Sequence, residues 1–374
     1  MSTNIGKQIV EKFYGSPQQK SYFYSCSSGG RQGFKAAQDF PDDFDGIVAG
    51  APGLAWNNFT AWSGYAYTTT MNETSPTFVP HDMWTVIHQD VLDQCDQLDG
   101  FKDGILENPS RCNYSSKGLI CGSSSRNSSC LTAAQSGTVD KMVSPLLDSN
   151  GDLIFPGMQP GAEILAGEFL YGRPVVHYVI DWFRYAVLND PNWDPATLTA
   201  GDYGYAYRAN PSDSETWKGD LSAAKAKGVK ILHWHGLMDP LITSENSNRY
   251  YRHVMETMKA TPEELDSFYR YFRISGSGHC EMGGDGAWNI GQSLPGTSQY
   301  PEDNLLMKMV KWVEEGVAPE TITGRKFEDD DPKKNVTHER KHCRYPKQNV
   351  YHGPGNTMLG EGWTCEAEPQ VQRR

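Results

Sequence analysis

The sequence lacks both long apolar runs and an excess of basic side chains. No stretch approaches the roughly 20 consecutive apolar residues that a membrane-spanning helix needs. The 374 residues hold 34 Lys and Arg against 46 Asp and Glu, which gives a net charge of −12. An acidic surface repels nucleic-acid phosphates. We therefore expect neither a membrane nor a nucleic acid as a partner.

The N-terminus also lacks an export signal, because residues 1–4 have neither a basic region nor an apolar core. The rest of the chain is nevertheless typical of a secreted glycoprotein, with eight cysteines and five Asn-x-Ser/Thr sequons. Sequons are also common by chance. They begin at Asn58, Asn72, Asn113, Asn127 and Asn335. We expect a secreted protein whose N-terminal part, with its signal peptide, is absent from this sequence.

Six of the cysteines fall in closely spaced pairs. These pairs are Cys95 with Cys112, Cys121 with Cys130, and Cys343 with Cys365. We expect each pair to form a disulfide, which leaves Cys26 to pair with Cys280. The alternative is that one of these last two is an ordinary buried cysteine.

Apolar patterning predicts a parallel sheet covered by helices, because strands and helices alternate at both ends of the chain. Strands are expected at 21–24, 45–52, 229–234 and 268–274, and helices at 5–14, 34–39, 244–259 and 301–315. Between about 62 and 220 this alternation stops, and aromatic residues, Pro, Gly and Asn are frequent. The last fifty or so residues are predicted to be a loop-rich tail held by a disulfide. We therefore predict an α/β fold with three segments, 1–65, 66–220 and 221–374, the middle one an inserted domain.

The segment Ser25 to Gly33 joins a predicted strand to a predicted helix through small residues. This is the setting of a nucleophile elbow, in which a sharp turn exposes a serine hydroxyl. Ser27 would be the nucleophile, and the backbone N–H of Ser28 would donate to the oxyanion. The usual pattern is Gly-x-Ser-x-Gly, and Ser25 replaces its first glycine. The alternative is an ordinary turn.

Two further residues follow predicted strands and complete a catalytic triad. Asp239 and His279 lie just after the strands that end near residues 234 and 274, and Ser, Asp, His is the order found in α/β-hydrolases. Alternatively, Asp239 forms an Asp-Pro turn and His279 is a solvated loop residue. His233 and His235 share a strand face and could indicate a metal pair. No third ligand is evident nearby, so we favour packing or hydrogen bonding for both.

These motifs resemble the fungal and bacterial tannase and feruloyl esterase family, in which Cys-Ser at the elbow and His-Cys at the base loop are joined by a disulfide. The matching positions here are Cys26-Ser27 and His279-Cys280, and similar stretches run along nearly the whole chain. The resemblance implies an α/β-hydrolase fold with a large inserted lid domain, and a serine esterase that acts on phenolic-acid esters. Only 26 residues precede Ser27, so the first hydrolase strands and one oxyanion donor are expected to be missing.

The segment Cys95 to Ile105 places three carboxylates in eight residues, which taken alone indicates an acidic turn. The family resemblance implies a structural Ca²⁺ here, which prefers oxygen ligands. Its ligands would be the side chains of Asp96, Asp99 and Asp103 and the carbonyls of Phe101 and Ile105. A Cys95–Cys112 bridge would close the loop around the ion.

The sequence thus predicts a secreted feruloyl esterase that acts on phenolic-acid esters, including those attached to plant cell-wall polysaccharide such as xylan. A tannase that cleaves galloyl esters is the close alternative. A truncated, inactive, calcium-stabilised binding module is the alternative from another class. The sequence predicts no particular oligomeric state.

Overall fold

The computed structural model describes residues 2–122, 130–171, 177–292, 302 and 304–368. Its centre is a four-stranded parallel sheet in the order β1-β2-β5-β6. The strands are β1 (Tyr22–Cys26), β2 (Gly46–Gly50), β5 (Lys230–Gly236) and β6 (Tyr269–Ile274). The predicted alternation of strands and helices at the two ends of the chain is therefore confirmed. No helix in these described ranges is both long and apolar enough to cross a bilayer.

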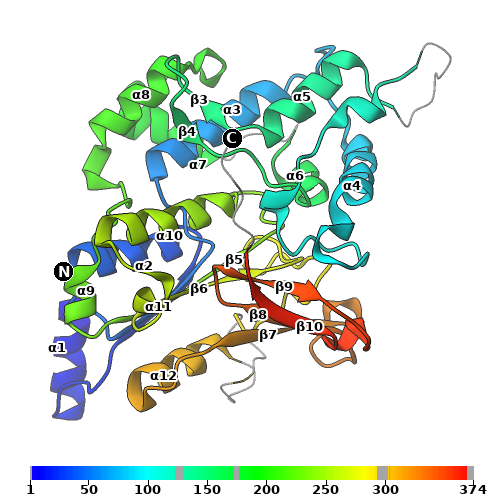
Figure 1. Ribbon diagram of the computed structural model, residues 1–374. Coiled ribbons are helices and arrows are strands. Elements are labelled where there is room, and N and C mark those ends of the chain that lie inside the picture. Colours follow the sequence, from blue (N-terminus) through cyan, green and yellow to red (C-terminus); the bar gives the residue numbers. More distant parts are fainter. Residues whose placement is uncertain (1, 123–129, 172–176, 293–301, 303, 369–374) are drawn as a thin grey trace.

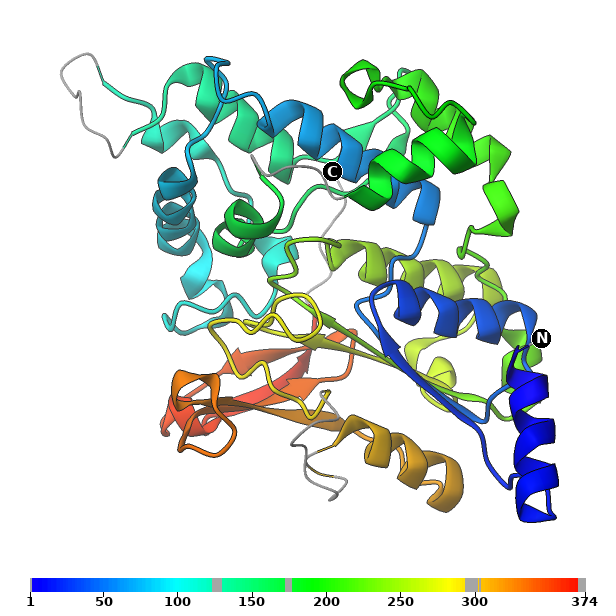
Figure 2. The same cartoon turned by 180° about the vertical axis from the view of Figure 1, so that it is seen from behind.

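Helices cover both faces of the sheet, which explains why β2, β5 and β6 are buried along almost their whole length. On one face, Ile47 and Ile231 pack in the same cluster as Phe34 of α2 (Ser28–Asp39) and Tyr250 of α10 (Glu245–Met258). On the other face, Val48 and Leu232 pack with α12 (Leu305–Glu315). Figure 2 shows α12 on the side of the sheet opposite α2 and α10. Three further helices are α1 (Ser2–Tyr14), α9 (Ser222–Ala226) and α11 (Pro262–Leu265).

The inserted segment, residues 51–229, lies between β2 and β5 in the sequence and is mostly helical. Figure 1 shows its helices from α3 (Trp56–Thr70) to α8 (Ala200–Ala209) above α2 and α10, on the side of the molecule opposite the C-terminal strands. Its elements are α3 (Trp56–Thr70), α4 (His81–Cys95), α5 (Ala133–Val143), β3 (Leu146–Leu147), β4 (Leu153–Phe155), α6 (Glu163–Phe169), α7 (His177–Asp181) and α8 (Ala200–Ala209). It has a separate apolar cluster around Trp62, Trp84 and Phe155. The domain boundaries at 65/66 and 220/221 remain a prediction.

The prediction of a loop-rich tail was wrong. Residues 321–367 form two antiparallel two-stranded sheets, which the Cys343–Cys365 disulfide joins. The strands are β7 (Thr321–Phe327), β8 (Val336–Cys343), β9 (Lys347–Tyr351) and β10 (Trp363–Ala367). Charged cross-strand pairs take the place of an apolar alternation. Arg325, for example, lies opposite Glu339, with Nε 3.0 Å from Oε2.

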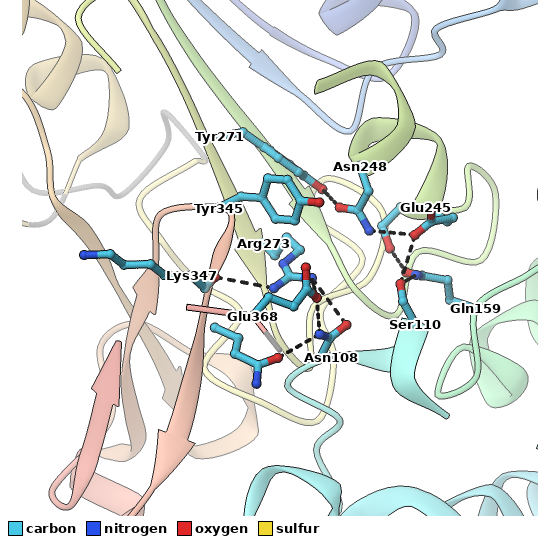
Figure 3. A network of polar contacts seen from close by, with 12 residues as sticks. Asn108, Ser110, Gln159, Glu245, Asn248, Tyr271, Arg273, Tyr345, Lys347 and Glu368 are labelled. Atoms are coloured by element: carbon cyan, nitrogen blue, oxygen red, sulfur yellow. Dashed lines mark hydrogen bonds and ion pairs between the residues drawn. The ribbon is translucent and has the colours of Figure 1, made fainter. Parts of the chain in front are cut away.

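Polar contacts, buried at Arg273 and closer to the surface at Ser110, attach the inserted segment and the tail to the sheet (Figure 3). Arg273 of β6 donates to Asn108 Oδ1 (3.3 Å) and forms an ion pair with Glu368 (3.1 Å). Ser110 donates to Glu245 of α10 (2.9 Å), which also accepts from Asn248 (2.8 Å). Because buried polar groups need partners, these bonds favour one seating of the inserted segment over the sheet.

Candidate active site

Ser27 sits in a strained turn between β1 and α2. Its φ of 63° and ψ of −127° place it in the left-handed half of the Ramachandran map. Such a conformation costs about 1–3 kcal/mol in a non-glycine residue and is concentrated at functional sites. Its N–H donates to Gly50 O (2.9 Å), so β2 holds the turn in place. Ser28, the proposed oxyanion donor, is exposed and begins the 12-residue helix α2.

The unusual Ser25 at the start of the elbow has a structural counterpart in Gly29. A Cβ on Gly29 would lie 1.8 Å from Ser25 Oγ, and the only other heavy atom within 4 Å would be Ser25 Cβ. Ser25 therefore occupies the space that a side chain at position 29 would need. At Gly30 the obstacle is backbone, because a Cβ there would lie 2.3 Å from Gly50 O. α2 therefore needs glycine at position 30 to start this close to β2, and glycine at position 29 as long as position 25 carries a serine.

Asp239 and His279 meet beyond the carboxyl ends of β5 and β6. His279 Nδ1 lies 2.6 Å from Asp239 Oδ2, and the other carboxylate oxygen accepts the N–H groups of Leu241 (2.9 Å) and Ile242 (2.8 Å). Asp239 is 2% exposed. Burial alone would raise the pKa of Asp239, but the charge of His279 and hydrogen bonds from His235 and His279 hold it well below its usual range. Asp239 is therefore placed to orient an imidazole and to stabilise its charge.

A disulfide joins the elbow to the loop that carries His279. The Cα atoms of Cys26 and Cys280 are 6.0 Å apart, next to Ser27 and His279 respectively. The two loops after β5 and β6 are also bonded to each other, with Met238 N donating to Ser277 O (2.8 Å). The structure contains the other three bridges as well, Cys95–Cys112, Cys121–Cys130 and Cys343–Cys365, so the predicted pairings are confirmed.

This geometry agrees with the comparisons to known proteins. The family model described as "Tannase and feruloyl esterase" matches residues 1–365. The chain belongs to the tannase and feruloyl esterase family. It is 48% identical over 362 residues to a protein named probable feruloyl esterase B-2 of Aspergillus terreus, covering 96% of this chain and 68% of that one.

Two solved structures are also similar to this family member. The crystal structure of an esterase from Aspergillus oryzae has a TM-score of 0.94 at 46% identity, covering 97% of this chain and 72% of that chain. The structure of feruloyl esterase B from the same organism has a TM-score of 0.93 at 44% identity, with the same coverages. The predicted α/β-hydrolase fold is therefore confirmed, and by family the chain is a carboxylic ester hydrolase.

His233 and His235 of this family member are hydrogen-bonded rather than arranged for a metal. Both rings contact Ser247 Oγ, at 2.9 Å from His233 Nε2 and 2.7 Å from His235 Nδ1. His235 Nε2 lies 3.0 Å from Asp239 Oδ2. Within the described ranges, no group of three or more His, Cys, Asp or Glu residues is arranged to hold a metal ion.

Composition predicted that aromatic residues of the inserted segment build the acyl pocket, but it did not single out which ones. Trp56 lies 6.1 Å from Tyr178 and 5.8 Å from Trp182, measured between ring centroids. Burial raises the pKa of Tyr178 to about 12, to which the charge of Asp239 also contributes. Tyr178 is therefore close enough to the acid–base pair for this charge to act on it. Trp56, six residues beyond the end of β2, is the one of these aromatic residues that the sequence places near the catalytic edge of the sheet.

In the acidic loop, the aspartate side chains accept hydrogen bonds from backbone N–H groups of the same loop. The carboxylates of Asp96, Asp99 and Asp103 accept backbone N–H groups of Gly104 (3.0 Å), Phe101 (3.1 Å) and Ile105 (3.2 Å) respectively. Asp96 Oδ1 is buried without a hydrogen-bond partner.

Arg340 compensates part of the negative charge in this loop, pairing with Asp103 (3.0 Å) and with Glu107. Even so, burial and then the charge of Glu107 raise the pKa of Asp99 to about 8. The calcium ligand set, with the Phe101 and Ile105 carbonyls, stays a prediction.

Proposed function

We propose that the chain hydrolyses esters of phenolic acids, feruloyl esters first, through an acyl-enzyme on Ser27. The observation that carries the proposal is the hydrogen-bonded pair of His279 and Asp239, joined through the Cys26–Cys280 bridge to the strained turn at Ser27. The names of the similar proteins, feruloyl esterases at 44–48% identity, support this substrate class.

In the proposed mechanism, His279 Nε2 takes the Ser27 hydroxyl proton as Ser27 Oγ attacks the ester carbonyl carbon. The N–H of Ser28, at the positive end of α2, donates to the developing oxyanion. The tetrahedral intermediate collapses when the alcohol leaves with the proton from His279. His279 then deprotonates a water that attacks the acyl-enzyme and releases the phenolic acid. Asp239 holds the Nδ1–H tautomer and stabilises the imidazolium in both steps.

The aromatic residues Trp56, Phe59, Tyr178 and Trp182 are the proposed wall for the phenolic ring. Phe59 and Tyr178 are stacked at 6.0 Å, and Trp56 also faces Arg31 of α2 with the guanidinium 4.9 Å from its ring centroid. Both α2 and Tyr178 are close to the catalytic residues. Aromatic side chains favour aromatic acyl groups through offset and edge contacts.

A panel of model esters tests the substrate class. We expect ferulate release from methyl ferulate to exceed gallate release from methyl gallate by at least about tenfold in kcat/KM, a difference of ~1.4 kcal/mol in transition-state binding. Liquid chromatography of the released acids is the measurement. Faster gallate release would instead identify a tannase. No turnover of either ester by a cooperatively folded protein would favour the binding-module alternative.

We also propose a secreted glycoprotein that acts on phenolic esters of plant polysaccharide such as xylan. Four disulfides support an oxidising compartment. Asn72, Asn113 and Asn335 are exposed and are the proposed glycan sites. Asn58 is less suited, because its amide donates to Ile154 O (2.9 Å) from within α3. The fifth sequon, at Asn127, lies outside the described residues.

A structural Ca²⁺ at the acidic loop is the remaining proposal. The buried Asp96 Oδ1, which has no hydrogen-bond partner, supports this idea, because a hard divalent cation would satisfy this oxygen. Asp96, Asp99 and Asp103 would hold the ion together with the carbonyls of Phe101 and Ile105. Bound there, the ion would brace the start of the inserted segment and would take no part in the chemistry.

A further inference from the structure

Behind Asp239, away from His279, a row of buried side chains forms a continuous hydrogen-bonded path. His235 Nε2 lies 3.0 Å from Asp239 Oδ2, and His235 Nδ1 lies 2.7 Å from Ser247 Oγ. Ser247 Oγ is 2.9 Å from His233 Nε2, and His233 Nδ1 is 2.9 Å from the Tyr269 hydroxyl. None of these residues is more than 2% exposed. The row thus crosses from β5 to α10 and on to β6 without reaching solvent.

The acceptors around His235 fix where its hydrogen lies. Besides Asp239 Oδ2, His235 Nε2 also faces the carbonyl oxygen of Ile242 at 2.9 Å. A carboxylate and a carbonyl can only accept, so Nε2 must carry the hydrogen. In the neutral ring Nδ1 is then an acceptor, and Ser247 donates its hydroxyl hydrogen to it.

The same reasoning continues to the end of the row. Because the Ser247 hydrogen is used, His233 Nε2 must donate to Ser247 Oγ, and His233 Nδ1 must accept from the Tyr269 hydroxyl. Burial, and next the proximity of His235, lower the pKa of His233 well below its usual value. Burial raises the pKa of Tyr269 well above its usual value. His233 and Tyr269 therefore stay neutral at neutral pH, and every hydrogen in the row points towards Asp239.

Asp239 Oδ2 is consequently shared between two imidazole N–H groups, from His279 at 2.6 Å and from His235 at 3.0 Å. Asp239 Oδ1 is held by two backbone N–H groups of its own loop. The carboxylate thus has four donors and no freedom to rotate. A second donor on Oδ2 also draws away part of the charge that would otherwise act on His279 alone.

We propose that His235 is a positioning residue for the catalytic acid, which directs Asp239 Oδ2 at His279 and limits how strongly this carboxylate favours protonated His279. Ser247, His233 and Tyr269 act one step further away, since they hold His235 in the required tautomer. The inference rests on the proposed roles of Asp239 and His279 and adds residues that do not touch the substrate. The titratable groups that face Asp239 and His235 from the surrounding elements are His233, Tyr269, His279 and Tyr178.

The test is an NMR titration of the His279 imidazole in the whole chain, in wild type, His235→Leu and His235→Gln. Leucine removes the donor, so we expect the midpoint of the His279 titration to move to higher pH by about one unit. Glutamine carries an N–H the same number of bonds from Cα as His235 Nε2. This variant is expected to keep the midpoint within a few tenths of a unit of wild type.

Two further variants separate positioning from stability. In Ser247→Ala, His235 Nδ1 loses its hydroxyl donor and the ring is held less firmly against Asp239. We therefore expect a smaller shift in the same direction, and this variant decides the matter if His235→Leu does not fold. His342→Leu is the matched control, because His342 is also fully buried, with Nε2 2.9 Å from Ala287 O. It should lower the melting temperature and leave the His279 midpoint in place.

An unchanged His279 midpoint in His235→Leu and Ser247→Ala, with a loss of stability like that of His342→Leu, would overturn the proposal. An equal shift in His235→Gln and His235→Leu would also overturn it. The titration needs no substrate, so its outcome is independent of whether feruloyl esters are the substrates.

Discussion

At the scale of single residues, the turn at Ser27 accommodates Ser25 because position 29 is glycine and leaves space for its side chain. The usual nucleophile-elbow pattern has glycine at the first position, and the structure shows what serine at position 25 requires of its neighbours. With a hydroxymethyl group at position 25, the first turn of α2 has no room for a side chain at position 29. The two positions are therefore expected to depend on each other, although each is only one of many small residues in the sequence.

We predict that Gly29→Ala lowers the free energy of unfolding by about 1–3 kcal/mol, the usual cost of overpacking, and reduces ester turnover. The double variant Ser25→Gly/Gly29→Ala removes both close atoms and should recover most of the stability and activity. Urea denaturation and release of phenolic acid are the measurements. Gly30→Ala is the control, because its obstacle is the Gly50 carbonyl, and adding Ser25→Gly should not rescue it. A double variant as unstable as Gly29→Ala would contradict this explanation.

The sequence singled out Ser27, Asp239 and His279 as candidates because each lies in a local motif at a strand end. It could not locate Ser247, because its link to His235 depends on how α10 packs against β5. Nor could it distinguish Asp96, with its unpartnered oxygen, from the neighbouring carboxylates of the same loop. Local patterns thus predict residues that meet at one sheet edge, whereas partners within a packed layer require the tertiary structure.

At the scale of elements, α4 and α6 of the inserted segment are joined by a buried pair. His88 Nδ1 lies 2.8 Å from Glu163 Oε2, and the same carboxylate accepts the N–H of Gly161. Burial alone would lower the pKa of His88, but the hydrogen bond and charge of Glu163 raise it above its usual value. The pair therefore stabilises the fold fully below about pH 6.5, and the contribution is lost as pH rises through the elevated pKa.

We predict that His88→Gln costs about 3 kcal/mol at pH 5.5 and clearly less at pH 9, as measured by urea denaturation. The control is His352→Gln, since His352 pairs with Glu366 on the surface and should cost less than about 1 kcal/mol at either pH. A difference between wild type and His88→Gln that is constant, or that grows with pH, would be inconsistent with a charged pair.

Elements of the sheet were more predictable from sequence than the tail. β5 and β6 are rich in aromatic and β-branched residues and are bounded by loops, and both were placed within two residues of their observed ends. β7 and β8 instead carry half-buried charged side chains such as Arg325 and Glu339, and only their pairing makes them strands. These strands are stabilised by pairs of side chains on two different chain segments, so neither segment alone carries a pattern that predicts a strand.

At the scale of the whole molecule, the predicted helix 5–14 shows how a correct element can lack its packing. α1 forms as expected, yet Ile5, Ile9 and Phe13 are 51%, 61% and 78% exposed. The periodicity of the sequence predicts which side of α1 is apolar. Whether that side is buried depends on the surface that packs against it, which periodicity does not predict.

We predict that calcium stabilises the whole molecule through the acidic loop. After treatment with EGTA, excess Ca²⁺ at about 100 times its Kd should add roughly 2.7 kcal/mol and raise the melting temperature by several degrees. Asp96→Asn should abolish this response, and Asp93→Asn, an exposed carboxylate on the adjacent helix, should preserve it. Calorimetry with and without Ca²⁺ decides; identical melting temperatures in wild type would exclude the site.

The central claim is that Ser27 carries the acyl group, and covalent trapping tests it most directly. The protein is acid-quenched during turnover of a feruloyl ester, or labelled with an aryl fluorophosphonate, and the modified peptide is identified by mass spectrometry. We expect one adduct on Ser27, absent from Ser27→Ala and retained in Ser28→Ala, because Ser28 contributes its backbone N–H. An adduct on another residue, or labelling that persists in Ser27→Ala, would contradict the claim.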